Sequence, residues 1–129
     1  HNIKVATHLA MHKAIKQLIL KDNKYHLLVD GRDFKIYNSI DEERGMIQIP
    51  HTCIEGGDNK YTSIAAASIL AKVARDQYIN DLCDNDNTLI ERYDLKKNKG
   101  YGTKQHMDGI KQFGITKHHR KTFGICRNY

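Results

Sequence analysis

The sequence predicts an α/β fold with a mixed sheet, of which this chain holds two parallel strands and at least three helices. The apolar run at residues 27–29 ends on Asp30, and continuous apolar residues suit a strand covered on both faces. Residues 47–54, entered through Pro50, predict a second strand. In an open α/β sheet the chemistry collects at the carboxyl ends of the strands.

Length and charge indicate the size of the domain and the kind of partner it binds. The chain has 129 residues, which is enough for one small domain, and 40% of them are hydrophobic, as in globular proteins. The formal net charge of +6 makes a polyanion the first partner to consider, with solubility alone as the alternative.

The cysteines and the hydropathy indicate a compartment. Cys53, Cys83 and Cys126 are an odd number at wide spacings, which predicts reduced thiols and a cytoplasmic protein rather than a disulfide framework or a zinc site. No run approaches the roughly 20 apolar residues of a membrane span, and no signal peptide leads the chain. We therefore expect no membrane partner. The chain starts at His1 without Met, which indicates a processed, expressed or incomplete start.

The first half of the chain reads as a helix, a strand and a loop. Apolar positions at helical spacing predict a helix from Ile3 to Leu20 with Asn2 as its N-cap, and the polar residues 21–24 end it. Residues 31–46 are polar without a clear period, so we expect a connecting loop. Its acidic run is interpreted as a solvated surface rather than a metal site.

The second helix is predicted to start at Thr62 or Ser63, either of which can cap it. The small residues 65–68 allow its first turns to lie close on a sheet. Five larger residues are expected to form its core face: Ile69, Leu70, Val73, Ile79 and Leu82. Later on this helix, Arg75 and Asp76 are interpreted as members of surface ion pairs.

A basic segment follows the turn-forming run at residues 84–87. Between residues 94 and 121, eight Lys and Arg side chains face only two acidic ones. The segment contains the turn Gly100-Tyr101-Gly102-Thr103 and a short helix from Lys104 to Phe113, which Gly114 ends. The Tyr101 ring is expected either to stack on a base or sugar or to fold back on the core. His118 and His119 are interpreted as surface or phosphate-neighbouring residues.

Asp30 and Asp58 are the candidate chemical pair. Both follow a predicted strand, so two carboxylates far apart in sequence meet at one edge of the sheet. Such a pair holds divalent metals or exchanges protons, and the neighbouring lysines favour a metal that bridges to a phosphate. The alternatives are an Asp-Gly turn at Asp30 and a helix-capping carboxylate at Asp58.

Six motifs in this order resemble the ribonuclease HII family, the type 2 ribonucleases H. They are Leu28-Val29-Asp30-Gly31, Ile49-Pro50-His51-Thr52, Gly57-Asp58-Asn59-Lys60-Tyr61, Ser63 to Lys72 with Arg75-Asp76, Lys96 to Thr103, and Lys117-His118-His119-Arg120-Lys121.

The resemblance implies a ribonuclease H-like fold and metal-dependent cleavage, with Mg²⁺ or Mn²⁺, of RNA in RNA–DNA hybrids or at a ribonucleotide embedded in a DNA duplex. Cleavage falls on the 5′ side and leaves a 3′-hydroxyl and a 5′-phosphate. Asp30 and Asp58 match the third and fourth metal-binding acids of the family, and Tyr101 matches the tyrosine that stacks on the sugar. The other residues assigned to substrate binding are Lys97, Lys99, Gly100, Gly102 and Thr103.

The chain also departs from the family pattern. The Asp-Glu pair, the Gly-Arg-Gly loop and the first three strands of the family are absent, and Gly56 stands where members often carry Lys. Residues 1–129 are therefore expected to form a single, partial catalytic domain with little or no activity alone. The alternatives are a nucleic-acid-binding half-domain, or a subunit that another chain completes.

Overall fold

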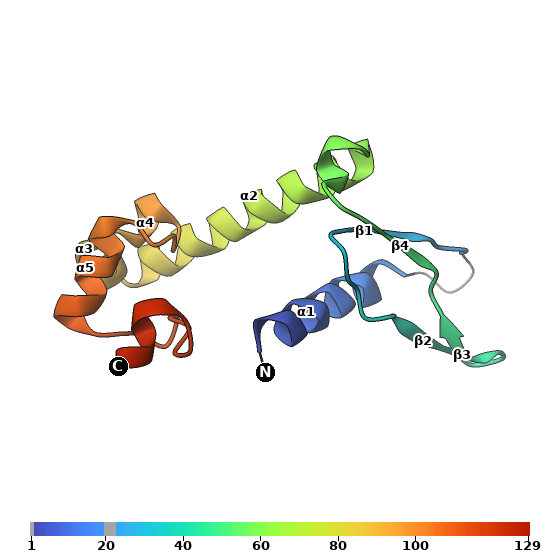
Figure 1. The fold of residues 1–129 in the computed structure, drawn as a ribbon, viewed down its shortest axis with the longest axis horizontal. Helices are drawn as coiled ribbons and strands as arrows, with labels where there is room; N and C mark the ends of the chain where they lie inside the picture. The colour runs from blue at the N-terminus through green and yellow to red at the C-terminus, as the bar shows by residue number, and fades with distance from the viewer. Residues whose placement is uncertain (1, 20–22) are drawn as a thin grey trace. The chain divides into compact units, whose positions relative to one another are not determined.

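The computed structural model describes residues 2–19 and 23–129, without the side chain of Asp41. They form two compact units, His1–Ser68 and Ile69–Tyr129, which are described separately (Figure 1).

The first helix, α1 (Ile3–Leu18), begins as predicted. The Val5 N–H donates to Asn2 Oδ1 at 3.0 Å, so Asn2 caps the helix. Ile19 is the C-cap in extended conformation, and the predicted end at Leu20 lies outside the described residues.

The predicted parallel pairing is confirmed, but the second strand covers only residues 51–54 of the predicted range 47–54, and residues 47 and 48 belong to a different sheet. Strand β1 (Leu27–Asp30) pairs in parallel with β4 (His51–Ile54), with Leu27 opposite His51 and Asp30 opposite Ile54 (Figure 1). The expectation that both faces of β1 are covered is wrong in this chain. Val29 is buried, but the side chain of Leu28, on the opposite face, is 40% exposed.

The prediction of an irregular loop over residues 31–46 is wrong in its second half. Strands β2 (Asn38–Asp41) and β3 (Gly45–Gln48) form an antiparallel hairpin, a second two-stranded sheet. Gly45 has a φ of +73°, a value that glycine adopts without strain, and it starts the return strand. The polar residues of these strands concealed them, because strand preference depends on packing more than on residue type.

Helix α2 (Thr62–Asn85) follows a short 3₁₀ turn, η1 (Gly57–Asn59). Its predicted core face is only partly correct. Ile79 and Leu82 pack in a core, but Ile69, Leu70 and Val73 are 61–71% exposed. Within the described residues, none of the helices has the length and apolarity needed to cross a membrane.

The second unit is helical. It contains α2 from Ile69 onward, then α3 (Thr88–Tyr93), α4 (Leu95–Asn98), α5 (Lys104–Phe113) and the 3₁₀ turn η2 (Gly124–Asn128). Helix α5 and its end at Gly114 match the prediction, whereas α3 and α4 were not predicted. The buried core consists of Ile79, Cys83, Leu89, Tyr93, Ile110 and Cys126.

Candidate functional site

The Asp30 carboxylate lies beside the turn that carries Asp58. Asp30 is the last residue of β1, and its Oδ1 atom accepts a hydrogen bond from the Gly57 N–H at 2.8 Å. The next amide, Gly31 N–H, donates to Ile54 O at 2.9 Å and so extends the β1–β4 pairing. The structure therefore brings the end of β1 to the turn that follows β4, as the sequence predicts.

Two glycines make this close approach possible. Gly56 has a φ of +59°, a left-handed conformation that reverses the chain before η1. A Cβ atom on Gly57 would lie 2.6 Å from Ile64 Cδ1 and 3.4 Å from Asp30 Oδ1. A larger residue at position 57 would therefore push Asp30 or Ile64 away from the turn.

Asp58 is exposed at the same turn. Its Oδ1 atom accepts from the Asn59 N–H at 3.0 Å, which leaves further lone pairs on the carboxylate for a ligand. Helix α2 begins four residues later. The first unit thus presents one carboxylate at the end of β1 and one on the turn after β4, both at the carboxyl edge of its parallel strand pair.

The donor chemistry of this pair fits part of a hard-cation site. Mg²⁺ and Mn²⁺ prefer carboxylate oxygens, and Asp30 and Asp58 supply them. No group of three His, Cys, Asp or Glu suited to a metal occurs within residues 2–19 and 23–129. Asp30 and Asp58 would therefore supply two of the carboxylate ligands of such a site.

Tyr101 lies on an exposed turn in the second unit. Lys99 and Gly100 both have positive φ, +52° and +79°, and they turn the chain sharply after α4. The Tyr101 side chain is 62% exposed, which confirms the exposed alternative over a ring packed in the core. Arg75 of α2 supports the turn: its Nη2 donates to Lys99 O at 2.7 Å, and its guanidinium lies 5.4 Å from the Tyr101 ring centroid.

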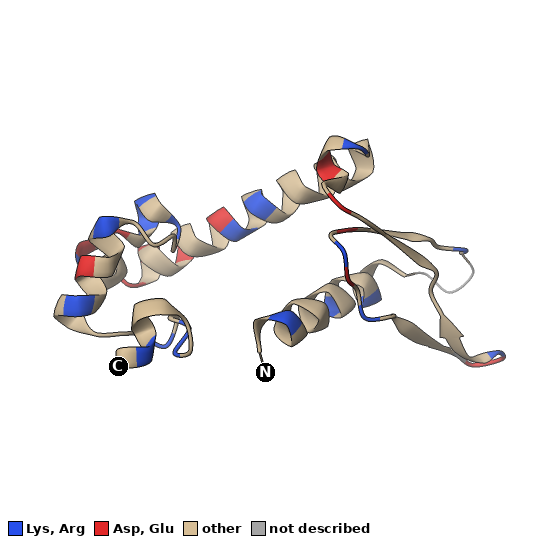
Figure 2. Cartoon of the chain, in the orientation of Figure 1, with Lys and Arg blue, Asp and Glu red and all other residues tan. Residues whose placement is uncertain are grey.

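The lysines around the turn differ in availability. Lys97 is exposed, whereas the Lys99 amine donates to Asn80 Oδ1 on α2. Lys96, which was not assigned a role, pairs with Asp84 at 2.7 Å. Figure 2 shows the Lys and Arg positions on α4, on α5 and in the C-terminal segment.

Gly102 and Thr103 complete the turn. Gly102 is exposed, and the Thr103 hydroxyl accepts from the His106 N–H at 3.4 Å as the N-cap of α5. The predicted binding residues therefore run from the end of α4, which contains Lys97, through the turn to Thr103 at the start of α5.

Two buried polar residues that support this turn, Asn98 and His106, were missed from the sequence. His119, interpreted as a surface or phosphate-neighbouring residue, is half-buried and its ring contacts His106. Asn98 and His106 are each 7% exposed. His106 Nδ1 lies 3.3 Å from Asn98 Oδ1, and His106 Nε2 lies 3.2 Å from His119 Nε2. The signal in the sequence was that His106 lies four residues, one helical turn, before the apolar Ile110 on the predicted helix.

Burial lowers the pKa of both histidines. For His106 the cause is desolvation, and for His119 desolvation is followed by the charges of His106 and His118, which lower its pKa further. The Tyr93 ring packs against both imidazoles and contributes to their burial.

We expect the free energy of unfolding to fall as the pH drops below 6.5, the ordinary histidine pKa. The unfolded chain takes up protons there first, because the folded-state pKa values are lowered. The slope is at most about 1.4 kcal/mol per pH unit for each histidine, and the loss levels off below the folded-state pKa values. Denaturant titrations above and below pH 6.5 measure it. A double variant, His106→Gln with His119→Gln, should lose this part of the pH dependence, and an unchanged profile would contradict the assignment.

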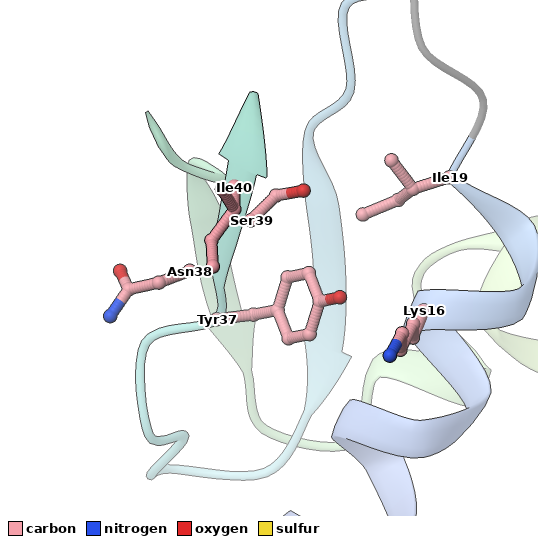
Figure 3. A pocket seen from close by; sticks show the side chains of 6 residues that line it. All are labelled: Lys16, Ile19, Tyr37, Asn38, Ser39 and Ile40. Carbon is pink, nitrogen blue, oxygen red and sulfur yellow. The ribbon is translucent and has the colours of Figure 1, made fainter. Parts of the chain in front are cut away.

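A separate pocket in the first unit has a volume of about 470 Å³ and is lined by Lys16, Ile19, Tyr37, Asn38, Ser39 and Ile40 (Figure 3). None of the predicted site residues lines it. It lies between the end of α1 and strand β2, so it is not formed by the turns that carry Asp30 and Asp58.

The described residues define an α/β protein with two carboxylates near the ends of its parallel strands and, separately, a lysine-rich turn that exposes a tyrosine. In a comparison with known protein families, the family model described as Ribonuclease HII matches residues 1–126. The chain belongs to the ribonuclease HII family. Its α/β architecture is consistent with part of the ribonuclease H-like fold that the sequence predicts.

Curated relatives agree with this membership. The chain is 47% identical over 124 residues to a protein named ribonuclease HII from Christiangramia forsetii. The aligned residues make up 96% of this chain and 55% of the relative. It is 48% identical over 124 residues to ribonuclease HII of Parabacteroides distasonis, with the same coverage of both chains. The ribonuclease HII of Staphylococcus saprophyticus is 48% identical over 122 residues, 95% of this chain and 41% of the relative. The chain spans about half the length of the curated relatives it matches.

Proposed function

We propose that this chain is part of a metal-dependent endonuclease that cleaves RNA in RNA–DNA hybrids and at ribonucleotides embedded in DNA. The observation that carries the proposal is the Asp30–Gly57 hydrogen bond, which holds one carboxylate beside the turn of the other. Family membership and the resemblance of the six motifs support the substrate class. Cleavage is proposed on the 5′ side of the ribonucleotide, leaving a 3′-hydroxyl and a 5′-phosphate.

Asp30 and Asp58 are the proposed metal-binding and catalytic residues. When bound, Mg²⁺ or Mn²⁺ would activate water and neutralise charge that develops on the phosphate. The Gly57 N–H donates to Asp30 Oδ1 and so restricts rotation of the carboxylate. The second oxygen, Oδ2, is therefore held in one orientation. Further carboxylates from outside this chain would complete the ligand set.

The turn from Lys97 to Thr103 is the proposed substrate-binding element. The exposed Tyr101 ring would stack on a sugar or base, and the Lys97 amine would neutralise a phosphate. Gly100 and Gly102 lack side chains, so the nucleic-acid backbone can approach the turn closely. The Lys99 amine is bonded to Asn80, so we expect Lys99 to contribute to substrate binding through its backbone, whose positive φ shapes the turn.

A second candidate function is nucleic-acid binding without cleavage, by a half-domain or a subunit that another chain completes. The limited metal ligands of the described residues favour it for the isolated chain. A cytoplasmic location is part of the proposal, and the three free cysteines support it.

The test uses an end-labelled DNA duplex with one ribonucleotide, in Mg²⁺ or Mn²⁺. We expect residues 1–129 alone to bind the duplex and to leave it uncut. A chimaera in which residues 1–126 replace the matching part of the Christiangramia forsetii protein is expected to cut 5′ to the ribonucleotide.

The outcomes separate the candidates. A folded chimaera that binds the duplex without cutting it would favour the binding module and contradict the nuclease proposal. Robust cleavage by residues 1–129 alone would show that two carboxylates suffice, or that two copies complete the site. An all-DNA duplex of the same sequence is the control, and it should remain intact.

A further inference from the structure

A chain of polar side chains runs behind the Tyr101 turn, from Thr116 through both histidines to Asn98. At one end the Thr116 N–H donates to His119 Nδ1 at 3.0 Å, and the Thr116 hydroxyl lies 2.9 Å from the same atom. At the other end the Gly100 N–H donates to Asn98 Oδ1 at 2.8 Å. These hydrogen-bonded side chains therefore link the C-terminal segment to Gly100, the residue that precedes Tyr101.

Backbone amides at both ends determine where the protons lie. Because the Thr116 N–H can only donate, His119 Nδ1 accepts, and a neutral His119 carries its proton on Nε2. This Nε2–H donates to His106 Nε2 at 3.2 Å, so a neutral His106 carries its proton on Nδ1. The His106 Nδ1–H then donates to Asn98 Oδ1.

The orientation of the Asn98 amide agrees with this assignment. Its Nδ2 donates to Tyr93 O at 2.6 Å, which leaves Oδ1 to accept from both Gly100 and His106. Every bond has one donor and one acceptor when both rings are neutral. A proton added to either ring would place two N–H groups face to face, at His106–His119 or at His119–Thr116.

Asn98 holds the turn in two ways. Its side chain accepts from the Gly100 N–H, and its carbonyl oxygen accepts from the Tyr101 N–H at 2.9 Å. Since Asn98 is 7% exposed, water does not replace these bonds readily. Whatever fixes the Asn98 amide therefore also fixes the backbone from which the Tyr101 ring projects.

We propose that His106 and His119 are positioning residues: as neutral rings with opposite tautomers, they hold the Asn98 amide so that it fixes the Gly100–Tyr101 turn for nucleic acid. The inference deepens the proposed function and rests on it for the role of Tyr101. The geometry of the turn itself does not depend on that function.

The first experiment reads the tautomers from the ¹⁵N imidazole signals of the full chain, at a pH above 6.5. We expect His106 with its proton on Nδ1 and His119 with its proton on Nε2. The opposite pattern, or the same tautomer on both rings, would overturn the proposal, because the bonds could not then run from Thr116 to Asn98.

The second experiment measures hydrogen exchange of the Gly100 amide in two variants of one residue. His106→Leu retains bulk without a donor and should raise the exchange rate about tenfold, the effect of one lost hydrogen bond. His106→Asn places an amide N–H where Nδ1 stood and should stay within about twofold of the parent chain. His118→Leu, an exposed neighbour, is the control, and equal exchange in His106→Leu and the parent would overturn the proposal.

Binding of the ribonucleotide-containing duplex separates the two proposals. We expect Tyr101→Ala and His106→Leu both to weaken binding, with His106→Asn close to the parent. If Tyr101→Ala binds like the parent while His106→Leu still speeds Gly100 exchange, the substrate role of the turn fails and the positioning role stands. If Tyr101→Ala weakens binding while Gly100 exchange is unchanged in His106→Leu, the positioning role fails.

Discussion

Gly109→Ala is expected to destabilise the second unit strongly. Helix α5 crosses α3 so closely that a Cβ atom on Gly109 would lie 2.0 Å from the Arg92 carbonyl oxygen and 3.2 Å from Tyr93 Cδ1. The nearest obstacle is backbone, so relief requires the helices to separate and open the core around Tyr93. We expect a loss of more than about 3 kcal/mol, which exceeds the gain of roughly 1 kcal/mol from replacing glycine by alanine in a helix.

Denaturant unfolding of the full chain, followed by hydrogen exchange of the α3 and α5 amides, measures this loss. Gly102→Ala is the matched control, because the nearest heavy atom to its added Cβ is Met107 Sδ at 3.9 Å. It should change stability by less than about 1 kcal/mol. Equal stability of the two variants would show that the α3–α5 crossing is looser than the structure indicates.

Asp30→Asn in the chimaera defined above is expected to abolish cleavage. The substitution retains an oxygen that can accept from Gly57 but removes the negative charge on which a hard cation depends. A loss of several kcal/mol of transition-state stabilisation corresponds to on the order of a thousandfold in rate. Single-turnover cleavage of the ribonucleotide duplex at saturating Mg²⁺ or Mn²⁺ gives the rate.

Asp33→Asn is the control for this variant. Asp33 lies three residues away, is exposed and pairs with Lys4, which holds the pKa of its carboxyl below the ordinary value. Removing this charge should leave the rate within about twofold, as for a surface ion pair. Similar losses in both variants would indicate a general charge effect rather than a metal ligand at Asp30.

Much of the local structure was predictable. The cap at Asn2, the parallel pairing of residues 27–30 with residues 51–54, and the helix from Lys104 to Phe113 all follow from capping chemistry and hydrophobic period. The hairpin within residues 31–48 was missed because its strands are polar and short. That the whole chain is a single catalytic domain stays a prediction.

The sequence predicts which residues form the candidate site, but it does not predict the contacts that these residues make. The strand ends and glycine turns identify Asp30, Asp58 and Tyr101, because residue type and order carry that information. The hydrogen bond of Asp30 to Gly57, and the support of Tyr101 by Arg75, depend on distances between segments 24 to 27 residues apart.

By itself, then, the sequence determined the family, the α/β class, the candidate carboxylates and the tyrosine turn, because each is carried by short motifs of fixed spacing. Only the tertiary structure decided that His106 and His119 lie behind that turn, and that Ile69, Leu70 and Val73 are exposed in this chain. The physical reason is the same in both cases. Burial and tautomer are set by what packs against a side chain, and a helical period shows a face without showing what covers it.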